Sequence, residues 1–437
     1  MSNLITSAII AKETLLNFRN NLVIAGNCDW KYNDKFGQSA NPIGNTYNLR
    51  RPIAVNVVEN NMAWNASLSS VQETTVQLVI DRTLTVPMSF SEGDLALKIA
   101  DFSSRYVAKA ARTAASRLDY RVADAIVNST VASASNAGLQ TAGLAGSAVG
   151  TPNAAGYVVG AYGTALTPAT ILDAKAYLME VGCPDDGEIY GVLTPTAQTQ
   201  LNSAQATLFN PLLKTDSVYM AGRIGTYAGI DFAASQSCAT HVNGTLATIA
   251  VTSGTLTSSW AESATLLVTS SAGVNPGDMF QSTVKLVNPL NKQPVSHAAQ
   301  FQVVSVPDAT HVVVSPAPVS AGAYQNVAAT IDGTNLTLVG ATGATGSESL
   351  IFHREAVACA SPELELPKKS SVDMAELIKN DDIEGFVLRF LRIFDGIGAS
   401  GSFGGGVGVG ASGMISRLDS AWGVKVANTA WVVRVRN

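Results

Sequence analysis

The sequence predicts an α+β fold that carries a separate all-β barrel or sandwich as an insertion. Three observations support this prediction: a long amphipathic helix over residues 91–129, two extended segments within 47–90, and a sharp loss of charge over 234–347. Helical and strand periodicities that occupy separate stretches of a chain are typical of α+β proteins. A chain of 437 residues is also long enough for about three domains.

Composition excludes several classes of protein. The chain is 46% apolar and 14% charged, with a net charge of −5, so it is not a disordered protein. It has no apolar run as long as the roughly 18 residues of a membrane span, and its start lacks the basic region of a secretion signal. An acidic balance argues against a dedicated nucleic-acid reader. So few charges suggest that neighbouring subunits cover much of the surface.

The N-terminal third begins with a predicted helix at residues 5–22 and a polar stretch at 33–46. Residues 47–90 then predict two long antiparallel strands joined by a polar tip. In the second strand Val76, Leu78 and Ile80 alternate with their neighbours at nearly period two. Because a long hairpin of this kind cannot build its own core, we expect it to lie on a neighbouring molecule.

Residues 91–129 contain the clearest helix of the chain, with apolar residues at steps of three and four. A second stripe on this helix is basic. Two interpretations stay open: a solvated face paired locally with Asp94 and Asp101, or a face presented to nucleic acid or to an acidic partner. The stripe consists of Lys98, Arg105, Lys109 and Arg112.

A mixed α/β zone follows a small-residue loop at 130–166. Residues 168–182 predict a helix that ends at Gly182, and residues 188–201 predict a buried strand, a turn and a short helix. The spacing in the first helix predicts that four residues face inward: Ile171, Leu172, Ala176 and Leu178.

The next segment is nearly free of charge. It carries six of the chain's 16 prolines and many Thr, Ser and Val residues in short runs, which is typical of a small all-β barrel or sandwich. The mixed pattern resumes at 348, so the β-rich segment interrupts a parent domain. Two strand-like stretches at 384–394 and 414–435, joined by the Gly-rich residues 395–413, close the chain. The charged residues between 233 and 347 are Glu262, Asp278, Lys285, Lys292, Asp308 and Asp332.

No motif for catalysis or cofactor binding in this sequence is complete. Gly396–Gly401 matches a dinucleotide-binding pattern, but the glycines that follow cannot begin the helix that the motif requires. Ser282 and Lys285 match a Ser-x-x-Lys pattern, yet residues three apart on a strand point to opposite faces. The four histidines lack metal-ligand spacing, and we expect structural or surface roles. We therefore predict no enzyme, no metal and no cofactor. The four cysteines, expected to be reduced and buried, are Cys28, Cys183, Cys238 and Cys359.

Several segments resemble one known family. Residues 9–25, IIAKETLLNFRNNLVIA, and then YNLRRP are similar to the opening of the major coat proteins of short-tailed phages of the Salmonella phage coat family. Residues 274–319 resemble the inserted β-barrel of that family, and SRLDSAWGVKV resembles its closing strand pair. The similarity runs over nearly the whole chain in the family's order.

The resemblance implies a Hong Kong 97-type capsid fold with an inserted domain. Its parts are an N-terminal arm, an extended hairpin called the E-loop, a peripheral (P) domain with a long spine helix, and an axial (A) domain. On this sequence the resemblance assigns 1–46 to the arm, 47–90 to the E-loop, 91–149 to the spine helix and P-domain, 150–233 to the A-domain, 234–347 to the inserted barrel, and 348–437 to the remaining A- and P-domains with a Gly-rich hairpin at 395–413.

The resemblance also implies function and partners. The chain is expected to be a major capsid protein that assembles in the host bacterial cytoplasm into the icosahedral head of a virion. Expected partners are further copies in hexamers and pentamers, a scaffolding protein, a portal protein, packaged double-stranded DNA bound without sequence specificity, and, as a further candidate, a decoration or cement protein. No membrane is involved.

Two departures from relatives matter. A member of the wider fold cross-links its subunits through an E-loop lysine, but residues 47–90 contain no lysine, so a non-covalent shell is predicted. The region 244–265 is poor in charge, so we do not expect the salt-bridged contact between capsomers that a charged loop makes there in the Salmonella relative.

Candidate subunit contacts in the E-loop are Arg50, Arg51, Trp64, Glu73 and Arg82, and the basic stripe of the spine helix is the candidate inward or intercapsomer face. An alternative function is the shell of a bacterial nanocompartment of the encapsulin type that packages an enzyme cargo, although the inserted domain argues against it. A secreted β-rich adhesin is a third hypothesis, and the absence of a signal peptide disfavours it.

Overall fold

The computed structural model describes residues 18, 21–32, 46–51, 74–80, 82–90, 108–129, 153–206, 225–364, 372–378, 387–394 and 414–437. The chain forms two compact units. The first contains 1–47, 78–119 and 358–424, and the second contains 48–77, 120–357 and 425–437.

The first unit is built on a five-stranded sheet. Strand β20 (Met414–Val426) lies inside the sheet, and β3 (Arg82–Phe90) pairs antiparallel with it from Arg82 opposite Trp422 to Phe90 opposite Met414. The other strands follow the order β17–β20–β19–β18, with bounds Val357–Ala360 for β17, Leu388–Phe394 for β19 and Val372–Ile378 for β18.

A helix and a short N-terminal turn also contribute to this unit. Helix α4 spans Ala108–Val127, and the 3-10 turn η1 spans Ala25–Asn27. The carboxylate of Asp119 on α4 accepts the backbone N–H groups of Val23 and Ala25, each at 2.8 Å. Burial raises the pKa of Asp119 to about 6, although these hydrogen bonds act in the opposite direction.

The second extended strand predicted within 47–90 is divided in the structure. Strand β1 (Thr46–Arg50) pairs with β2 (Thr75–Val79) in a two-stranded sheet, whereas β3 pairs with β20. The chain passes so close to β20 between β2 and β3 that a Cβ atom on Gly423 would lie 2.2 Å from the carbonyl oxygen of Val79. Glycine therefore permits the change of sheet, which residue alternation alone does not reveal.

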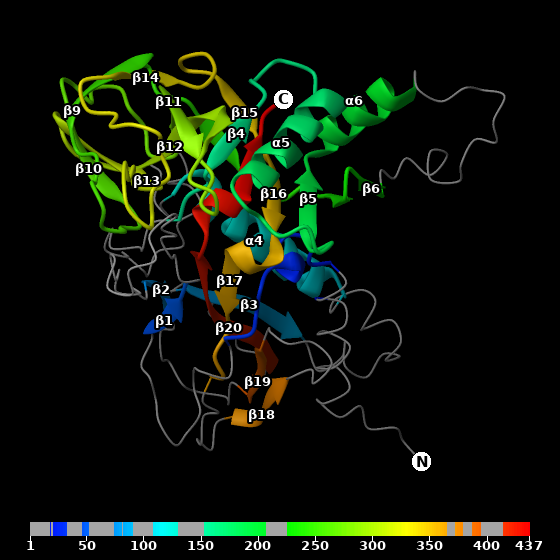
Figure 1. The fold of residues 1–437 in the computed structure, drawn as a ribbon. Helices are drawn as coiled ribbons and strands as arrows, with labels where there is room; N and C mark the ends of the chain where they lie inside the picture. Colours follow the sequence, from blue (N-terminus) through cyan, green and yellow to red (C-terminus); the bar gives the residue numbers. More distant parts are fainter. Residues whose placement is uncertain are drawn as a thin grey trace, which may run out of the picture. The chain divides into compact units, whose positions relative to one another are not determined.

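The second unit contains a six-stranded sheet with two helices and the inserted barrel (Figure 1). Parallel pairs β21–β4 and β5–β7 are combined with antiparallel pairs β16–β21, β16–β5 and β6–β7. The order is β4 (Tyr157–Val159), β21 (Val432–Val435), β16 (Ser349–His353), β5 (Ile189–Leu193), β7 (Ile230–Ala234) and β6 (Thr226–Tyr227). Two 3-10 turns, η5 (Arg354–Ala356) and η6 (Thr429–Trp431), flank it.

The predicted helices of the mixed zone are present as α5 (Pro168–Glu180) and α6 (Pro195–Ala206). Thr167 caps α5 by accepting the N–H of Thr170 at 3.4 Å. Ile171 and Leu178 are buried as predicted, but Leu172 is 50% exposed and Ala176 is exposed too. Tyr177 takes the inward position instead, because its ring stacks on Tyr157 of β4 at 4.2 Å between centroids.

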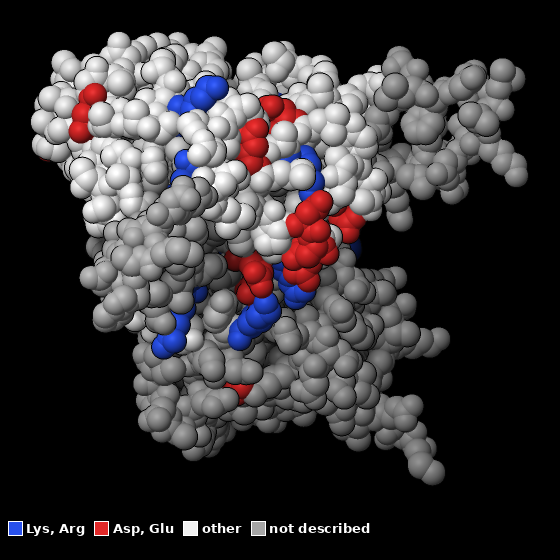
Figure 2. Space-filling view, in the orientation of Figure 1, with Lys and Arg blue, Asp and Glu red and all other residues white. Residues whose placement is uncertain are grey.

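The charge-poor segment forms a closed six-stranded barrel. Its strands follow the order β10–β13–β12–β11–β14–β9, and a short sheet of β8 (Thr240–Val242) and β15 (Thr345–Ser347) connects it to the parent. Apolar side chains such as Leu266, Phe280, Phe301 and Val312 fill its interior. Figure 2 shows few charged side chains on its visible face. The bounds are Thr248–Ser253 for β9, Ala264–Val268 for β10, Met279–Val287 for β11, Pro294–Asp308 for β12, His311–Ser315 for β13 and Asn335–Leu338 for β14.

Candidate functional site

The predicted contact residues of segment 47–90 separate in the structure. Arg50 is exposed at the end of β1, whereas Arg51 is partly buried and its guanidinium lies 4.9 Å from the ring centroid of Trp260. Arg82 on β3 lies 5.0 Å over the ring of Trp422 in the same unit. The other two residues of this set, Trp64 and Glu73, lie outside the described residues.

Half of the basic stripe can be placed. Lys109 and Arg112 are exposed on α4, one turn apart, while Lys98 and Arg105 lie outside the described residues. Thr113 on the same stretch donates its hydroxyl to the carbonyl of Lys109 at 2.9 Å. The exposed position of Lys109 and Arg112 fits both a solvated face and a contact surface, so their role stays a prediction.

The most extensive buried polar contacts join the barrel to the parent sheet within the second unit. Two glutamines on β12, Gln300 and Gln302, share one face of that strand. The Gln300 side chain accepts the N–H of Val158 at 2.8 Å. Gln302 accepts the N–H of Ala155 at 2.7 Å and donates to the carbonyl of Val127 at 2.9 Å. Gln302 thus also caps the C-terminal end of α4, where carbonyl groups lack helical partners.

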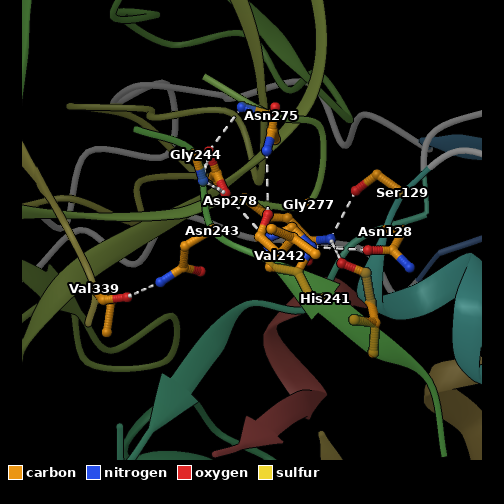
Figure 3. Close-up of polar contacts among 12 residues, drawn as sticks. Asn128, Ser129, His241, Val242, Asn243, Gly244, Asn275, Gly277, Asp278 and Val339 are labelled. Carbon is orange, nitrogen blue, oxygen red and sulfur yellow. Dashed lines mark hydrogen bonds and ion pairs between the residues drawn. The ribbon is translucent and has the colours of Figure 1, made fainter. Parts of the chain in front are cut away.

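His241 and Asp278 form the centre of a second cluster (Figure 3). The His241 ring places Nε2 3.0 Å from Asp278 Oδ1 and Nδ1 2.8 Å from the side-chain oxygen of Asn128. Asp278 also accepts the N–H groups of Gly244 at 3.0 Å and Asn275 at 2.7 Å. Burial lowers the pKa of His241, and the hydrogen bond to Asp278 opposes this effect. Through Asn128, which follows α4, and Asp278, which precedes β11, this cluster joins the end of α4 to the base of the barrel.

A fully buried ion-pair triad completes the junction. Glu348 lies between Arg434 and Arg436 of the C-terminal strand, and all three side chains are 0% exposed. Arg434 Nη2 donates to Glu348 Oε1 at 2.6 Å, and Arg436 Nε donates to the same oxygen at 2.8 Å. Burial alone would raise the pKa of Glu348, but the two guanidinium groups outweigh it and hold this pKa below its ordinary range.

The same arginines extend from the sheet into the barrel. Arg434 Nη1 donates to the carbonyl of Gly277 and Arg436 Nη1 to the carbonyl of Val339, both at 2.6 Å. The Arg436 guanidinium also lies 4.6 Å from the ring centroid of Tyr162, whose hydroxyl bonds Glu348. Directional bonds of this kind fix the orientation of the barrel on the sheet, which apolar contact alone would leave adjustable.

His297 provides a further contact between β12 and helix α5. Its Nδ1 lies 2.6 Å from Glu180 Oε2, and its Nε2 lies 3.2 Å from Asp173 Oδ1. Tyr157 and Tyr177 meet the ring edge-on. Burial would lower the pKa of His297, but its bonds to the two carboxylates prevail and raise it. A ring with carboxylates at both nitrogens is stabilised in its charged form.

One group of side chains resembles a metal site, but its hydrogen bonds explain it without a metal. Asp186, Glu188 and His353 place ligand atoms within 4.8 Å of one another. His353 Nδ1 accepts the N–H of Glu355 at 3.3 Å, so the proton of the neutral ring resides on Nε2. That nitrogen faces Asp186 at 3.1 Å and donates to it, which leaves the ring no lone pair for a cation.

The described residues show no catalytic constellation either. A cavity of about 300 Å³ at the start of α6 is lined by hydroxyl, amide and thiol groups, including Thr194, Ser235 and Cys238. No carboxylate or imidazole side chain lines it to act as a general base. All four cysteines are free and buried, as predicted. No helix among the described residues is long and apolar enough to cross a membrane.

Sequence reasoning overlooked the residues of the junction. Gln300 and Gln302 stand two apart in the otherwise apolar run AAQFQVV, and Arg434 and Arg436 stand two apart in WVVRVR. A polar pair on one face of an apolar strand is a detectable signal, because burying such groups requires partners. The sequence could therefore have identified the residues, although not what they bind.

The sequence model of a family described as P22 coat protein, gene protein 5, matches residues 1–396. No curated protein sequence matches the chain significantly. Among solved structures, one from Mycobacterium phage Che8 is similar with a TM-score of 0.44 at 13% identity and covers 95% of this chain and 90% of its own.

Two further solved structures are similar to this chain. The capsid structure of the cyanophage P-SCSP1u has a TM-score of 0.40 at 11% identity, and the match covers 90% of this chain and 83% of that one. The CUS-3 coat protein I-domain has a TM-score of 0.19 at 21% identity, and the match covers 21% of this chain and 95% of that one.

Proposed function

From the premise that the chain belongs to the P22 coat protein family, we propose that it is the subunit of a non-covalent icosahedral head shell with the Hong Kong 97-type fold. The observation that carries the proposal is the family match over residues 1–396, together with a closed barrel inserted between β7 and β16. Members of this family are structural coat proteins of phage virions and not enzymes. The match favours a phage capsid over the encapsulin alternative.

We assign the parts of the chain accordingly. The proposal takes 1–46 as the arm, 47–90 as the E-loop, 91–149 as spine helix and P-domain, 150–233 and 348–437 as A- and P-domain parts, and 234–347 as the inserted domain. The split into β2 and β3 supports an E-loop whose root is β1–β2 and whose returning strand joins the P-domain sheet.

Assembly follows from many modest contacts. Each subunit offers an arm and a hairpin to its neighbours, so weak pairwise contacts add up through multivalency. Arg50, Trp64, Glu73 and Arg82 are the proposed hairpin contacts to neighbours, whereas Arg51 of the same predicted set has an internal partner in Trp260. A scaffolding protein, a portal protein, a decoration protein and double-stranded DNA are further proposed partners. The exposed Lys109 and Arg112 support a contact with an acidic partner, such as DNA or a neighbouring subunit.

Expression of the full chain with and without a candidate scaffolding protein tests this function. Negative-stain electron microscopy and sedimentation should show closed shells or open spirals of megadalton mass. A well-behaved monomer under both conditions would contradict self-assembly as the primary function.

Three narrower experiments test its parts. Denaturing gels of mature particles should show no higher-mass ladders, because segment 47–90 has no lysine. Deletion of residues 58–72 should reduce shell yield, and an unchanged yield would refute the hairpin role. Truncation of residues 1–20 should impair co-assembly with the scaffold, and normal co-assembly would refute a role of the arm there.

A further inference from the structure

The end of β1 that leads to residue 52 contacts the inserted barrel of the same chain. Arg51 directly follows β1, and its guanidinium lies 4.9 Å from the ring centroid of Trp260 in the barrel loop between β9 and β10. Arg51 Nη2 also donates to the side-chain oxygen of Asn428 at 3.3 Å. A stacked guanidinium with a hydrogen bond is held in direction as well as in position.

Two more charged groups belong to this contact. Glu262, two residues after Trp260, forms an ion pair with Lys425, whose side chain is 0% exposed. Burial lowers the pKa of Arg51, while the negative charge of Glu262 opposes that effect. Glu262 is one of only six charged residues between 233 and 347. The inserted barrel has few carboxylates, and one of them, Glu262, interacts with Lys425 and Arg51 from other parts of the chain.

The backbone of Arg51 connects this contact to both strands of the hairpin. Its N–H donates to the carbonyl of Thr74 at 3.0 Å, and Thr74 directly precedes β2. Whatever fixes Arg51 therefore fixes the end of β1 and the start of β2 together, because paired strands move as one ladder.

We propose that the inserted barrel orients the assembly hairpin of its own subunit through Arg51, with Trp260 and Glu262 as positioning residues. This inference rests on the proposed capsid function, because only an assembling subunit needs a hairpin aimed at a neighbour. It gives Arg51 an internal role in place of the direct contact with a neighbouring subunit that the sequence suggested. It also gives the insertion a task in assembly beyond its own folding.

Hydrogen exchange on the unassembled full-length chain tests the internal contact. Arg51→Met keeps an unbranched aliphatic side chain and removes the charge and the hydrogen-bond donors. Amides of β1 and β2 should then exchange about 5- to 30-fold faster, while those of β10 and β13 keep their rates. Lys285→Met, which removes an exposed positive charge from the barrel, is the matched control and should change neither region.

Two variants on the barrel side complete the test. Glu262→Gln and Trp260→Leu should accelerate exchange in β1 and β2 as Arg51→Met does, and all three should lower the fraction of closed shells relative to Lys285→Met. If Arg51→Met lowers shell yield but leaves exchange unchanged, Arg51 contacts a neighbour directly and the inference is wrong. Equal acceleration in hairpin and barrel would also overturn it, since it would indicate general destabilisation.

The two proposals fail in different ways. A wild-type chain that forms no shells with or without scaffold contradicts the capsid function. The positioning role is contradicted only by the exchange rates of the variants, which are measured before any assembly takes place.

Discussion

The interior of the inserted barrel and its junction with the parent sheet are stabilised by different forces. Inside the barrel, Leu266, Phe280, Phe301 and Val312 are almost fully buried. At the junction, glutamine, histidine, glutamate and arginine side chains are buried to a similar degree, and the main bonds run to backbone groups and paired charges.

This difference separates stability from orientation. Apolar burial is non-directional, so it stabilises a closed barrel without specifying how the barrel sits on its neighbour. Buried hydrogen bonds and ion pairs tolerate little displacement, because an unpaired buried group is costly. The barrel therefore holds its own shape by apolar packing, whereas its direction on the sheet depends on a small number of polar residues. Four sets of variants test this difference.

The largest effect is expected from Glu348→Gln at the junction. The change leaves two buried guanidinium groups without a counter-charge, so the free energy of unfolding should fall by about 3–5 kcal/mol in denaturant titration. Glu355→Gln makes the same chemical change at an exposed position and should stay within about 0.5 kcal/mol. A loss at Glu348 no larger than in this control would show that the triad does not hold the junction.

Leu266→Ala tests the barrel interior. Removing this buried side chain leaves a cavity and should cost about 2–5 kcal/mol by the same titration. Leu290→Ala, on a side chain that is 80% exposed, is the matched control and should change stability by about 0.5 kcal/mol or less. Because the removed contacts are apolar, the loss in the free energy of unfolding should be independent of salt concentration. A strong salt dependence would contradict the view that apolar packing stabilises the barrel interior.

Gln302→Leu should cost about 1–3 kcal/mol, since the N–H of Ala155 and the carbonyl of Val127 lose their partner. The signature is local: the amide of Ala155 should exchange faster, while barrel strands β10 and β13 stay protected. Gln293→Leu replaces an exposed glutamine of the same strand pair and should leave both measurements unchanged. Unchanged protection of the Ala155 amide would show that Gln302 does not stabilise the junction through this hydrogen bond.

The smallest effect concerns His297 and pH. Its pKa is raised above the ordinary 6.5, so its contribution is complete below pH 6.5 and is lost as pH rises through the folded-state pKa. The loss should be about 1 kcal/mol or less, because its partner Asp173 is largely exposed. The facing titratable groups are Glu180, Asp173, Tyr157 and Tyr177.

Thermal unfolding followed between pH 6 and 9 provides the measurement. Wild type should lose stability over this range relative to His297→Gln, which has no group to titrate there. His311→Gln, which removes the more exposed pair with Asp308, should follow wild type closely. Parallel profiles for wild type and His297→Gln would show that this histidine does not hold β12 on α5.

The sequence determined the elements of the fold because their signals are local. A run of 115 residues with only six charges predicted an inserted β-domain, and the structure closes that segment into a barrel. Thr167 before Pro168 and Gly182 after the helix likewise set the limits of α5, since caps act on adjacent backbone groups.

Only the tertiary structure decided what these elements pair with. Period-two alternation through 74–90 could not show that the chain leaves β1 after Val79 and joins β20 at Arg82, because alternation specifies faces and not partners. Leu172 was expected inside but is half exposed, whereas Tyr177 of the same helix is buried and stacks on Tyr157 of β4. The sequence does not show which groups Arg51, Gln302 and Arg434 bind. Their roles come from residues more than 100 positions away, which only the folded chain brings within hydrogen-bonding distance.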